Sequence, residues 1–468
     1  MIRPPTPRPP SIHRLRAIFL AALFLCAAAY AGAAERAQPI RRVIIVSIDG
    51  LMPATYVAPD THGLAVPTLR EIVKSGAWSD GARSVFPSVT YPAHASIATG
   101  VNPGVHGIVS NGAFDPMGKN QQGWRWYAED IRAPTLWDAA RARSLTTALI
   151  WWPTTVGARA AAVVPEYWRA GSEDDVKLVR ALATPGLLEA VAARFPKFNE
   201  NFTPPALQDE ALADIAVHTI EALKPNLLML HLPRVDHEEH EGGPFGDKAK
   251  AAIEVADRQL ARIIAAAKDA GTWSETALVV LSDHGFARIS RRVRPGTLLL
   301  EKNLVTYDQS RMADWKASIL TTAAFAYVYV KDPADAATRK TLLEIFPALQ
   351  HKADSGIRRV YRQEEIRAKG GDPAAFLALE AAEGYEMAGG YRGAHFSPSF
   401  QAGTHGYDPD RPEMFASLLI YGPAIAPGKI KQARLIDVAP TVARWLDLKL
   451  ERAEGKPLAV SLRTAARP

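Results

Sequence analysis

Five short, almost wholly apolar segments recur along the chain and constrain its fold more than any other feature. Runs of this length and continuity are typical of strands buried on both faces, as in a parallel sheet. Longer amphipathic stretches separate them and predict helices. The expected strands are residues 42–48, 147–151, 226–232, 277–282 and 416–421, and the expected helices are residues 67–75, 207–223, 248–270 and 436–446. This alternation predicts an α/β fold: a doubly wound, mostly parallel central sheet with helices on both faces.

Residues 287–400 follow a different pattern. Residues 322–331 (TAAFAYVYVK) alternate in character, a short basic run follows at 356–361, and Gly-Gly pairs mark turns at 370–371 and 389–390. We therefore predict a small α+β insertion at about 287–400 on a single domain that spans residues 35–468. The sequence contains no GxGxxG or P-loop lysine motif, so it gives no support for dinucleotide or P-loop chemistry.

The N-terminal segment is typical of a secretory signal. Four arginines and no acid precede an apolar run at residues 17–31, and small residues follow at 32–34. We expect residues 1–34 to be a cleaved signal peptide and the protein to be exported, periplasmic or secreted. An uncleaved membrane anchor is the alternative, although the run is short and rich in alanine. No later apolar run approaches membrane length, so we expect no membrane span in the mature chain.

Charge and cysteine content change once this segment is set aside. The full chain carries a formal charge of +6, and four of its 55 basic residues lie in the signal segment. The mature chain is then close to neutral, and we expect no nucleic-acid-binding module in it. The single cysteine, Cys26, also lies in the signal segment, so neither a disulfide nor a cysteine-rich zinc cluster is expected.

Three acids stand where three of the expected strands end. Asp49 and Asp283 close the runs at 42–48 and 277–282, and Asp236 comes four residues after the run at 226–232. The carboxyl ends of parallel strands meet at one edge of a sheet, where open α/β sheets bind their ligands. A lone aspartate at a strand end is usually a turn residue, but three acids together predict a shared site.

Histidines accompany these acids. His240 follows Asp236 at i+4, His284 is adjacent to Asp283, and His405 lies in the glycine-flanked segment GTHGYD. Carboxylates and imidazoles without a thiolate suit zinc or a similar divalent ion. Three acids and three histidines are too many for one catalytic ion with an open position. They predict two ions about 4 Å apart, as in phosphoryl transfer.

A candidate nucleophile lies in residues 84–100 (SVFPSVTYPAHASIATG). Thr90 precedes Tyr91 and Pro92, and proline favours the first turn of a helix. Thr90 would then face the N–H groups and the positive dipole end of a helix, which stabilise an alkoxide and a phosphate. The alternative is that Thr90 or Ser88 is only an N-cap.

These motifs together resemble the nucleotide pyrophosphatase/phosphodiesterase family of the alkaline phosphatase superfamily. The resemblance runs from about residue 42 to about residue 446 and rests on IVSIDG (45–50), VFPSVTYPAHASIATG (85–100), HGIVSN (106–111), SDHG (282–285) and GTHGYDP (403–409). It implies an alkaline phosphatase-like fold and two zinc ions. The implied activity is hydrolysis of phosphodiester or phosphoanhydride bonds of nucleotide-type substrates through a phosphothreonine at Thr90.

The resemblance also implies roles for single residues. One zinc would be held by Asp49, Thr90, Asp283 and His284, and the other by Asp236, His240 and His405. The side-chain amide of Asn111 would bind a non-bridging phosphate oxygen, and Tyr91 and Tyr167 would line a nucleoside slot. For Tyr167, a half-buried surface aromatic is an equal alternative. We expect structural roles for His94 and His106, and solvated loop positions for His237, Glu238 and Glu239, with tuning of the site by their charge as the alternative.

Three other functions stay open. A phosphomonoesterase on the same core would need extra basic residues, for which Arg125, Arg132 and Arg169 are candidates. A phosphonate or choline-phosphodiester hydrolase would use the same metals with a different pocket. A non-catalytic binding protein with this fold is disfavoured by the intact set of candidate residues. The sequence does not indicate the oligomeric state.

Overall fold

The computed structural model describes residues 38–119, 123–169, 171–203 and 208–464. The signal peptide expected over residues 1–34 lies outside the described residues. Eight strands form the central sheet, in the order β18-β2-β17-β6-β1-β5-β3-β4. Their bounds are β1 Arg42–Ile48, β2 Ala77–Trp78, β3 Thr147–Ile150, β4 Ala162–Val164, β5 Leu227–Leu232, β6 Thr276–Leu281, β17 Leu418–Tyr421 and β18 Gly428–Lys429.

Five adjacent strands of this sheet are parallel. β1 lies between β5 and β6, and Val46 pairs with Leu230 on one side and Val280 on the other. β3 and β4 continue the parallel set. β17 differs, because it pairs antiparallel with both β6 and β2. The parallel direction expected for residues 416–421 is therefore wrong: their apolar character reflects burial on both faces and does not fix strand direction.

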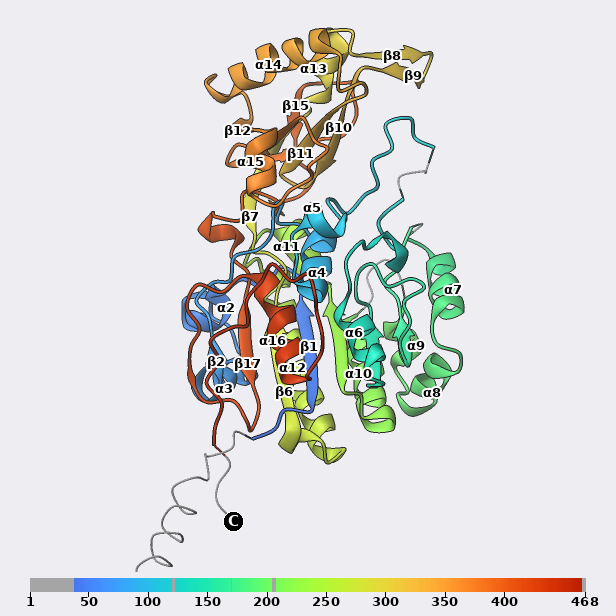
Figure 1. The fold of residues 1–468 in the computed structure, drawn as a ribbon, viewed down its shortest axis with the longest axis vertical. Helices are drawn as coiled ribbons and strands as arrows, with labels where there is room; N and C mark the ends of the chain where they lie inside the picture. The colour runs from blue at the N-terminus through green and yellow to red at the C-terminus, as the bar shows by residue number, and fades with distance from the viewer. Residues whose placement is uncertain (1–37, 120–122, 170, 204–207, 465–468) are drawn as a thin grey trace, which may run out of the picture.

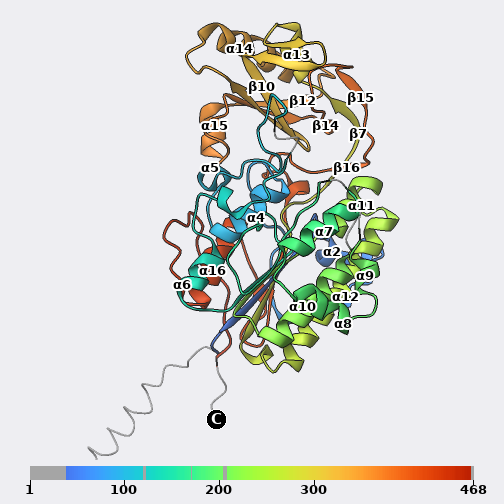
Figure 2. The same cartoon turned by 90° about the vertical axis from the view of Figure 1, so that its right-hand side faces the viewer.

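Helices cover both faces of the central sheet (Figures 1 and 2). Alternate residues of β1 point to opposite faces, so Ile44 and Val46 pack with one set of helices and Val43 and Ile45 with the other. The first set is α2 Ala54–Val57, α3 Pro67–Ser75, α7 Glu173–Leu182, α8 Leu187–Arg194, α9 Phe198–Asn201, α10 Asp209–Leu223, α11 Arg234–Gly242 and α12 Asp247–Asp269. The second is α4 Thr90–Thr99, α6 Leu136–Ala142 and α16 Val438–Trp445. This arrangement confirms the doubly wound α/β fold.

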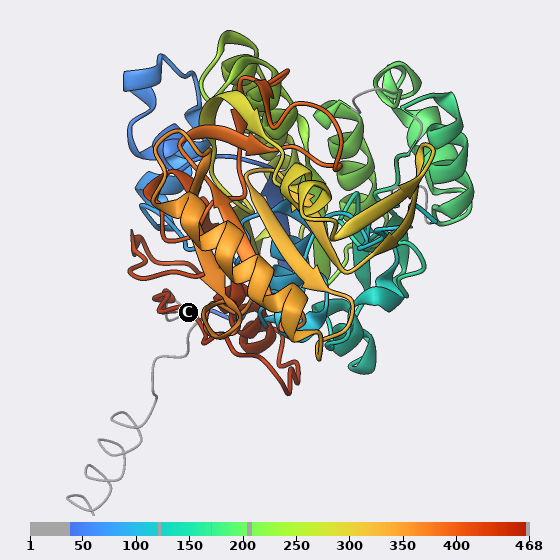
Figure 3. The same ribbon diagram turned by 90° about the horizontal axis from the view of Figure 1, so that it is seen from above.

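A second sheet stands above the carboxyl ends of the parallel strands (Figure 1). It is antiparallel, in the order β10-β11-β13-β12, with bounds β10 Ala317–Thr322, β11 Phe325–Val330, β12 Ile357–Arg362 and β13 Leu377–Ala381. α13 Gly296–Glu301 and α14 Ala336–Gln350 pack on one face, and α14 lies over the sheet when seen from above (Figure 3). The opposite face packs on Phe86 and Val109 of the core. Residues 322–331 include a tight turn, because Thr322 pairs with Phe325 across a hairpin.

Shorter elements complete the fold. β7 Ala287–Val293 pairs with β14 Gly384–Met387, β15 Phe396–Pro398 and β16 Gly403–Thr404, and β8 Val305–Asp308 forms a hairpin with β9 Arg311–Trp315. The remaining helices are α5 Pro103–His106 and α15 Gln363–Ala368, with 3₁₀ turns at Pro59–His62, Ala128–Asp130, Trp273–Glu275, Pro412–Met414 and Leu435–Asp437.

The two ends of the described chain meet below the central sheet, opposite the upper sheet (Figure 1). The backbone N–H of Gln38 donates to the carbonyl oxygen of Arg463 at 3.2 Å. Within the described ranges, none of the helices combines the length and apolarity that a membrane crossing requires.

Candidate active site

The three strand-end acids lie together at the carboxyl edge of the parallel strands. Asp49 directly follows β1, Asp283 comes two residues after β6, and Asp236 lies in the first turn of α11 beyond β5. Asp49 and Asp283 are buried. Burial, followed by the charges of Asp283 and Asp236, raises the pKa of Asp49 well above its usual range. Crowded buried carboxylates of this kind call for positive charge between them.

The three candidate histidine ligands share one hydrogen-bonding pattern. Each places its Nδ1 against a backbone carbonyl oxygen, which can only accept a hydrogen bond. The pairs are His240 with Gly403 at 3.0 Å, His284 with Gly285 at 3.1 Å and His405 with Ser88 at 3.1 Å. Nδ1 therefore carries the proton, and in the neutral ring each Nε2 keeps a lone pair. A histidine whose Nδ1 is engaged in this way is oriented to bind a metal through Nε2.

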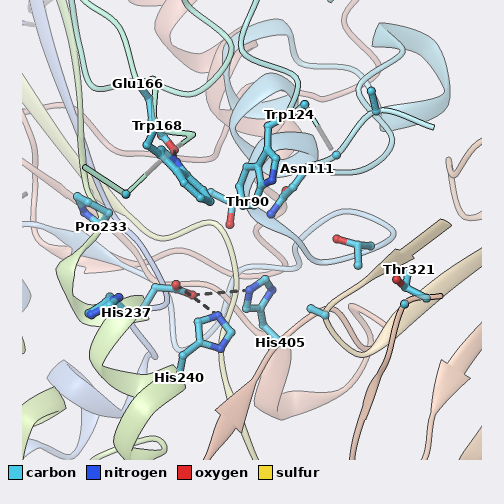
Figure 4. Close-up of a pocket in the computed structure, with 18 of the residues that line it drawn as sticks. Thr90, Asn111, Trp124, Glu166, Trp168, Pro233, His237, His240, Thr321 and His405 are labelled. Carbon is cyan, nitrogen blue, oxygen red and sulfur yellow. Dashed lines mark hydrogen bonds and ion pairs between the residues drawn. The ribbon is translucent and has the colours of Figure 1, made fainter. Parts of the chain in front are cut away.

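Each Nε2 faces the acids. The Nε2 atom of His284 lies 3.4 Å from Oδ1 of Asp49 and 3.0 Å from Oδ2 of Asp283. For Asp236, Oδ2 lies 3.5 Å from Nε2 of His240 and Oδ1 lies 3.7 Å from Nε2 of His405. These last two contacts are drawn as dashed lines in Figure 4.

Two overlapping groups of these residues could hold metal ions: Asp49 with Asp283 and His284, and Asp236 with His284 and His405. Oδ1 of Asp49 and Oδ1 of Asp236 are buried and receive no hydrogen bond from the described residues. Unpaired buried carboxylate oxygens beside oriented imidazoles fit divalent ions that prefer nitrogen and oxygen ligands, such as zinc.

Two glycines allow the backbone to approach this closely. A Cβ atom on Gly285 would lie 2.1 Å from the carbonyl oxygen of Glu413, so no larger residue fits after His284. Gly406 has a φ of +88°, which a side chain disfavours, and it turns the chain directly after His405.

Thr90 is the first residue of α4, and all ten residues of this helix are buried. The N-cap is Val89, which makes no side-chain cap. Ser88 donates its hydroxyl to the carbonyl oxygen of Tyr407 at 2.7 Å. The capping alternative for Thr90 and Ser88 therefore does not hold. Oγ1 of Thr90 lies 3.5 Å from Nε2 of His284, so the hydroxyl lies at both a helix start and the candidate metal centre.

Asn111 lies beside Thr90 on the same wall of the pocket (Figure 4). Oδ1 of Asn111 accepts a hydrogen bond from the backbone N–H of Tyr91 at 2.9 Å. Since an N–H donor must face an oxygen, this contact fixes the orientation of the amide. The two N–H donors of the Asn111 side chain are left for other partners.

Tyr91 does not line the pocket. Its ring is fully buried, its hydroxyl donates to Oε1 of Glu166 at 3.0 Å, and Trp124 packs edge-on against it with ring centroids 5.2 Å apart. The expectation that Tyr91 lines the substrate slot is therefore wrong. Trp124 packs against Tyr91 and lines the pocket in its place. Tyr167 does line the pocket and is 9% exposed.

The cavity over these residues has a volume of about 1280 Å³ and reaches the upper sheet. Trp124 and Trp168 lie on one side of Thr90, while His240 and His405 lie on the other (Figure 4). Neither tryptophan was predicted, since no sequence pattern links residues 124 and 168. His231 and Glu166 were also missed, although a histidine within the apolar run NLLMLHL signals a buried polar group that needs a partner.

Other histidines and acids near the centre have different environments. His94 and His106 are fully buried, burial lowers the pKa of each to about 3, and neither joins a candidate metal group. The solvated loop expected for residues 237–239 is wrong. These residues form part of α11, and Glu238 and Glu239 are buried. Burial and then the charge of Asp236 raise the pKa of Glu239 well above its usual range.

The sequence of this chain is similar to those of known phosphodiesterases and nucleotide pyrophosphatases. A family model described as type I phosphodiesterase/nucleotide pyrophosphatase matches residues 43–408. Bis(5'-adenosyl)-triphosphatase ENPP4 of Bos taurus is 24% identical over 413 residues, which cover 87% of this chain and 78% of that protein. Ectonucleotide pyrophosphatase/phosphodiesterase family member 5 of Homo sapiens is 24% identical over 437 residues, which cover 92% and 80% respectively.

Solved structures show the same fold. The murine ectonucleotide pyrophosphatase/phosphodiesterase 5, in an inactive form in complex with AMP, matches with a TM-score of 0.64 at 22% identity. The match covers 89% of this chain and 97% of that chain. The human protein of the same name matches with a TM-score of 0.64 at 21% identity and with the same coverage.

Proposed function

The chain belongs to the type I phosphodiesterase/nucleotide pyrophosphatase family, and from that premise we propose that it is a two-zinc hydrolase of phosphodiester or phosphoanhydride bonds in nucleotide-type substrates. The observation that carries the proposal is the position of the Thr90 hydroxyl. It lies at the start of a buried helix and 3.5 Å from Nε2 of His284, within a cluster of three oriented imidazoles and three carboxylates. One zinc would be held by Asp49, Thr90, Asp283 and His284, and the other by Asp236, His240 and His405.

The reaction proceeds in two displacements. Bound zinc supplies Lewis acidity that lowers the pKa of a hydroxyl and offsets charge on a phosphate. Thr90 loses its hydroxyl proton to solvent, and Oγ1 forms a bond to phosphorus as the bond to the leaving oxygen breaks, which gives a phosphothreonine. Water then attacks phosphorus and loses a proton, the bond to Oγ1 breaks, and Oγ1 takes up a proton to regenerate the threonine. The Asn111 amide and the backbone N–H of Thr90, the first residue of α4, donate to the non-bridging oxygens, where charge is concentrated.

The charge of the cavity favours a diester over a monoester. A phosphate monoester carries an additional negative charge, which calls for extra cations. Arg234 is the one arginine or lysine among the described lining residues, and Glu238 pairs with it. Arg125, Arg132 and Arg169 do not line the cavity. The aromatic side chains of Trp124, Trp168 and Tyr167 instead offer surfaces on which a nucleobase can stack.

The substrate class is tested with chromogenic esters on the zinc-loaded mature protein. We expect a thymidine 5'-monophosphate p-nitrophenyl ester to be hydrolysed best, bis-p-nitrophenyl phosphate next and p-nitrophenyl phosphate least. A large preference for the simple monoester would overturn the diesterase assignment. A preference for p-nitrophenyl phosphorylcholine would move the substrate from nucleotides to choline diesters.

The nucleophile is tested with Thr90→Ala. This variant should lose covalent labelling by a phosphoryl substrate, and its turnover should fall by orders of magnitude with zinc retained. Thr99→Ala is the matched control, because Thr99 is buried at the far end of α4 and donates to the carbonyl oxygen of Ala95 at 2.7 Å. Near-normal turnover of zinc-loaded Thr90→Ala would contradict the proposed role.

Export is part of the same proposal. The charge and apolarity of residues 1–34 support a cleaved signal. The protein recovered from the periplasm or medium should have the mass of a chain that begins near residue 35. Recovery of the full-length chain in the membrane fraction would favour an anchor instead.

A further inference from the structure

His231 is a polar side chain within the apolar strand β5, and it is 1% exposed. A buried imidazole in such a place needs hydrogen-bond partners. Its Nε2 lies 2.9 Å from Oδ2 of Asp49. Its Nδ1 lies 3.1 Å from Oε2 of Glu166 and 3.2 Å from the carbonyl oxygen of Trp151. The Asp49 and Glu166 carboxylates and the carbonyl oxygen of Trp151 all accept hydrogen bonds, so both ring nitrogens donate.

Glu166 extends this contact toward the substrate cavity. It follows β4 and is 4% exposed. Its second oxygen, Oε1, accepts from the hydroxyl of Tyr91 at 3.0 Å and from Nε1 of Trp168 at 3.2 Å. A continuous chain of hydrogen bonds therefore runs from Asp49 through His231 and Glu166 to Trp168, which lines the cavity.

This chain of contacts determines which oxygen of Asp49 faces the metal centre. Oδ2 is occupied by His231. Oδ1 receives no hydrogen bond from the described residues and lies 3.4 Å from Nε2 of His284. Without His231, the carboxylate would be free to rotate and present either oxygen, or both, to an ion. Partners of this kind fix ligand orientation in metal sites.

We propose that His231 and Glu166 are positioning residues that hold Asp49 in its metal-binding orientation and couple that orientation to Trp168 at the substrate wall. The inference rests on the proposed function and extends it to two residues outside the ligand set. It requires that a change at either residue alter zinc binding at the Asp49 site. A change at Glu166 must also alter the recognition of substrates that reach Trp168.

His106 is the control for a buried histidine with a purely structural role. His106 is as buried as His231, and its Nε2 lies 2.9 Å from Oγ of Ser96. Its Nδ1 accepts from the backbone N–H of Ile108 at 3.1 Å. Since these contacts include none of the candidate ligands, His106→Gln should lower the melting temperature and leave zinc affinity unchanged.

The test is zinc titration of the mature protein in competition with a chromogenic chelator, which needs no substrate. Wild type should bind two zinc ions. His231→Gln should bind one of them roughly 10–100-fold more weakly. Glu166→Gln keeps the side-chain shape but removes the negative charge that strengthens both contacts, the one to His231 and the one to Trp168. It should also weaken one zinc site and should raise KM for the thymidine ester more than for bis-p-nitrophenyl phosphate.

The outcomes separate the two proposals. Unchanged affinity for both zinc ions in His231→Gln and Glu166→Gln would overturn the positioning role even if wild type is an active diesterase. Wild type that binds two zinc ions but hydrolyses no ester would overturn the proposed function, while the titration would still decide the role of His231. If His231→Gln fails to fold, the isosteric Glu166→Gln gives the zinc measurement.

Discussion

Replacement of Asn111 by aspartate perturbs the proposed phosphate site while preserving its shape. The backbone N–H of Tyr91 donates to Oδ1 of Asn111 at 2.9 Å, and an aspartate keeps that hydrogen bond with one oxygen. Its second oxygen then stands where the amide nitrogen was. Loss of one donor to developing charge costs about 3 kcal/mol, or roughly 10²–10³ in rate. Repulsion between a carboxylate and a phosphate oxygen at about 4 Å adds about 4 kcal/mol at an effective dielectric constant of about 20.

The assay is kcat/KM for the thymidine ester, with zinc content and melting temperature measured on the same samples. We expect the kcat/KM of Asn111→Asp to fall by on the order of 10⁵-fold at full zinc content, since the two effects sum to about 7 kcal/mol. Asn111→Ala removes the donor without adding charge, so its rate should lie between those of wild type and Asn111→Asp. The reasoning is refuted if Asn111→Asp, fully loaded with zinc and normally folded, stays within about tenfold of wild type.

Three further outcomes concern stability, metal and substrate recognition. Asp209 is fully buried at the start of α10, and burial raises its pKa to about 7. Because its folded-state pKa lies above the unfolded value, the stability it contributes falls as pH rises from about 4 to about 7, by up to about 4 kcal/mol. Asp209→Asn should therefore have a higher melting temperature than wild type at pH 8 in calorimetry, and the difference in melting temperature should be smaller at pH 5. An equal difference at both pH values would contradict this. Chelation of zinc should abolish hydrolysis and lower the melting temperature, since the strand-end carboxylates lose their countercharge; full activity after exhaustive chelation would exclude a metal role. Trp124→Ala should raise KM for the thymidine ester by roughly tenfold or more but change bis-p-nitrophenyl phosphate less, because it removes a stacking surface; equal effects on both esters would argue against base stacking.

Local patterns in the sequence were sufficient for the elements that build the core. The β1 bounds, Arg42–Ile48, match the apolar run, and α3 and α12 match their amphipathic stretches to within one residue. The sequence also predicted that Asp49, Asp236 and Asp283 lie together, because parallel strands share a carboxyl edge. Burial of a strand on both faces can be predicted from the residues of that strand alone.

Which strand or side chain a residue contacts cannot be predicted in this way. The antiparallel direction of β17 depends on which strand it meets, and no residue of LLIY encodes that. The burial of Tyr91 follows from Trp124, which lies 33 residues further along and packs over it. Glu166 reaches His231 across 65 residues of chain. Such contacts arise from the assembled fold, so periodicity and motif spacing do not predict them.

The meeting of the chain ends, Gln38 against Arg463, has a consequence for how the centre depends on connectivity. The candidate ligands come from segments spread between residues 49 and 405, yet all reach one edge of one sheet. If the ends were joined and the chain opened at the exposed turn between β8 and β9, every strand would keep its neighbours. The order of segments along the polypeptide is thus separable from the spatial arrangement that builds the centre, and circular permutants would carry the same site.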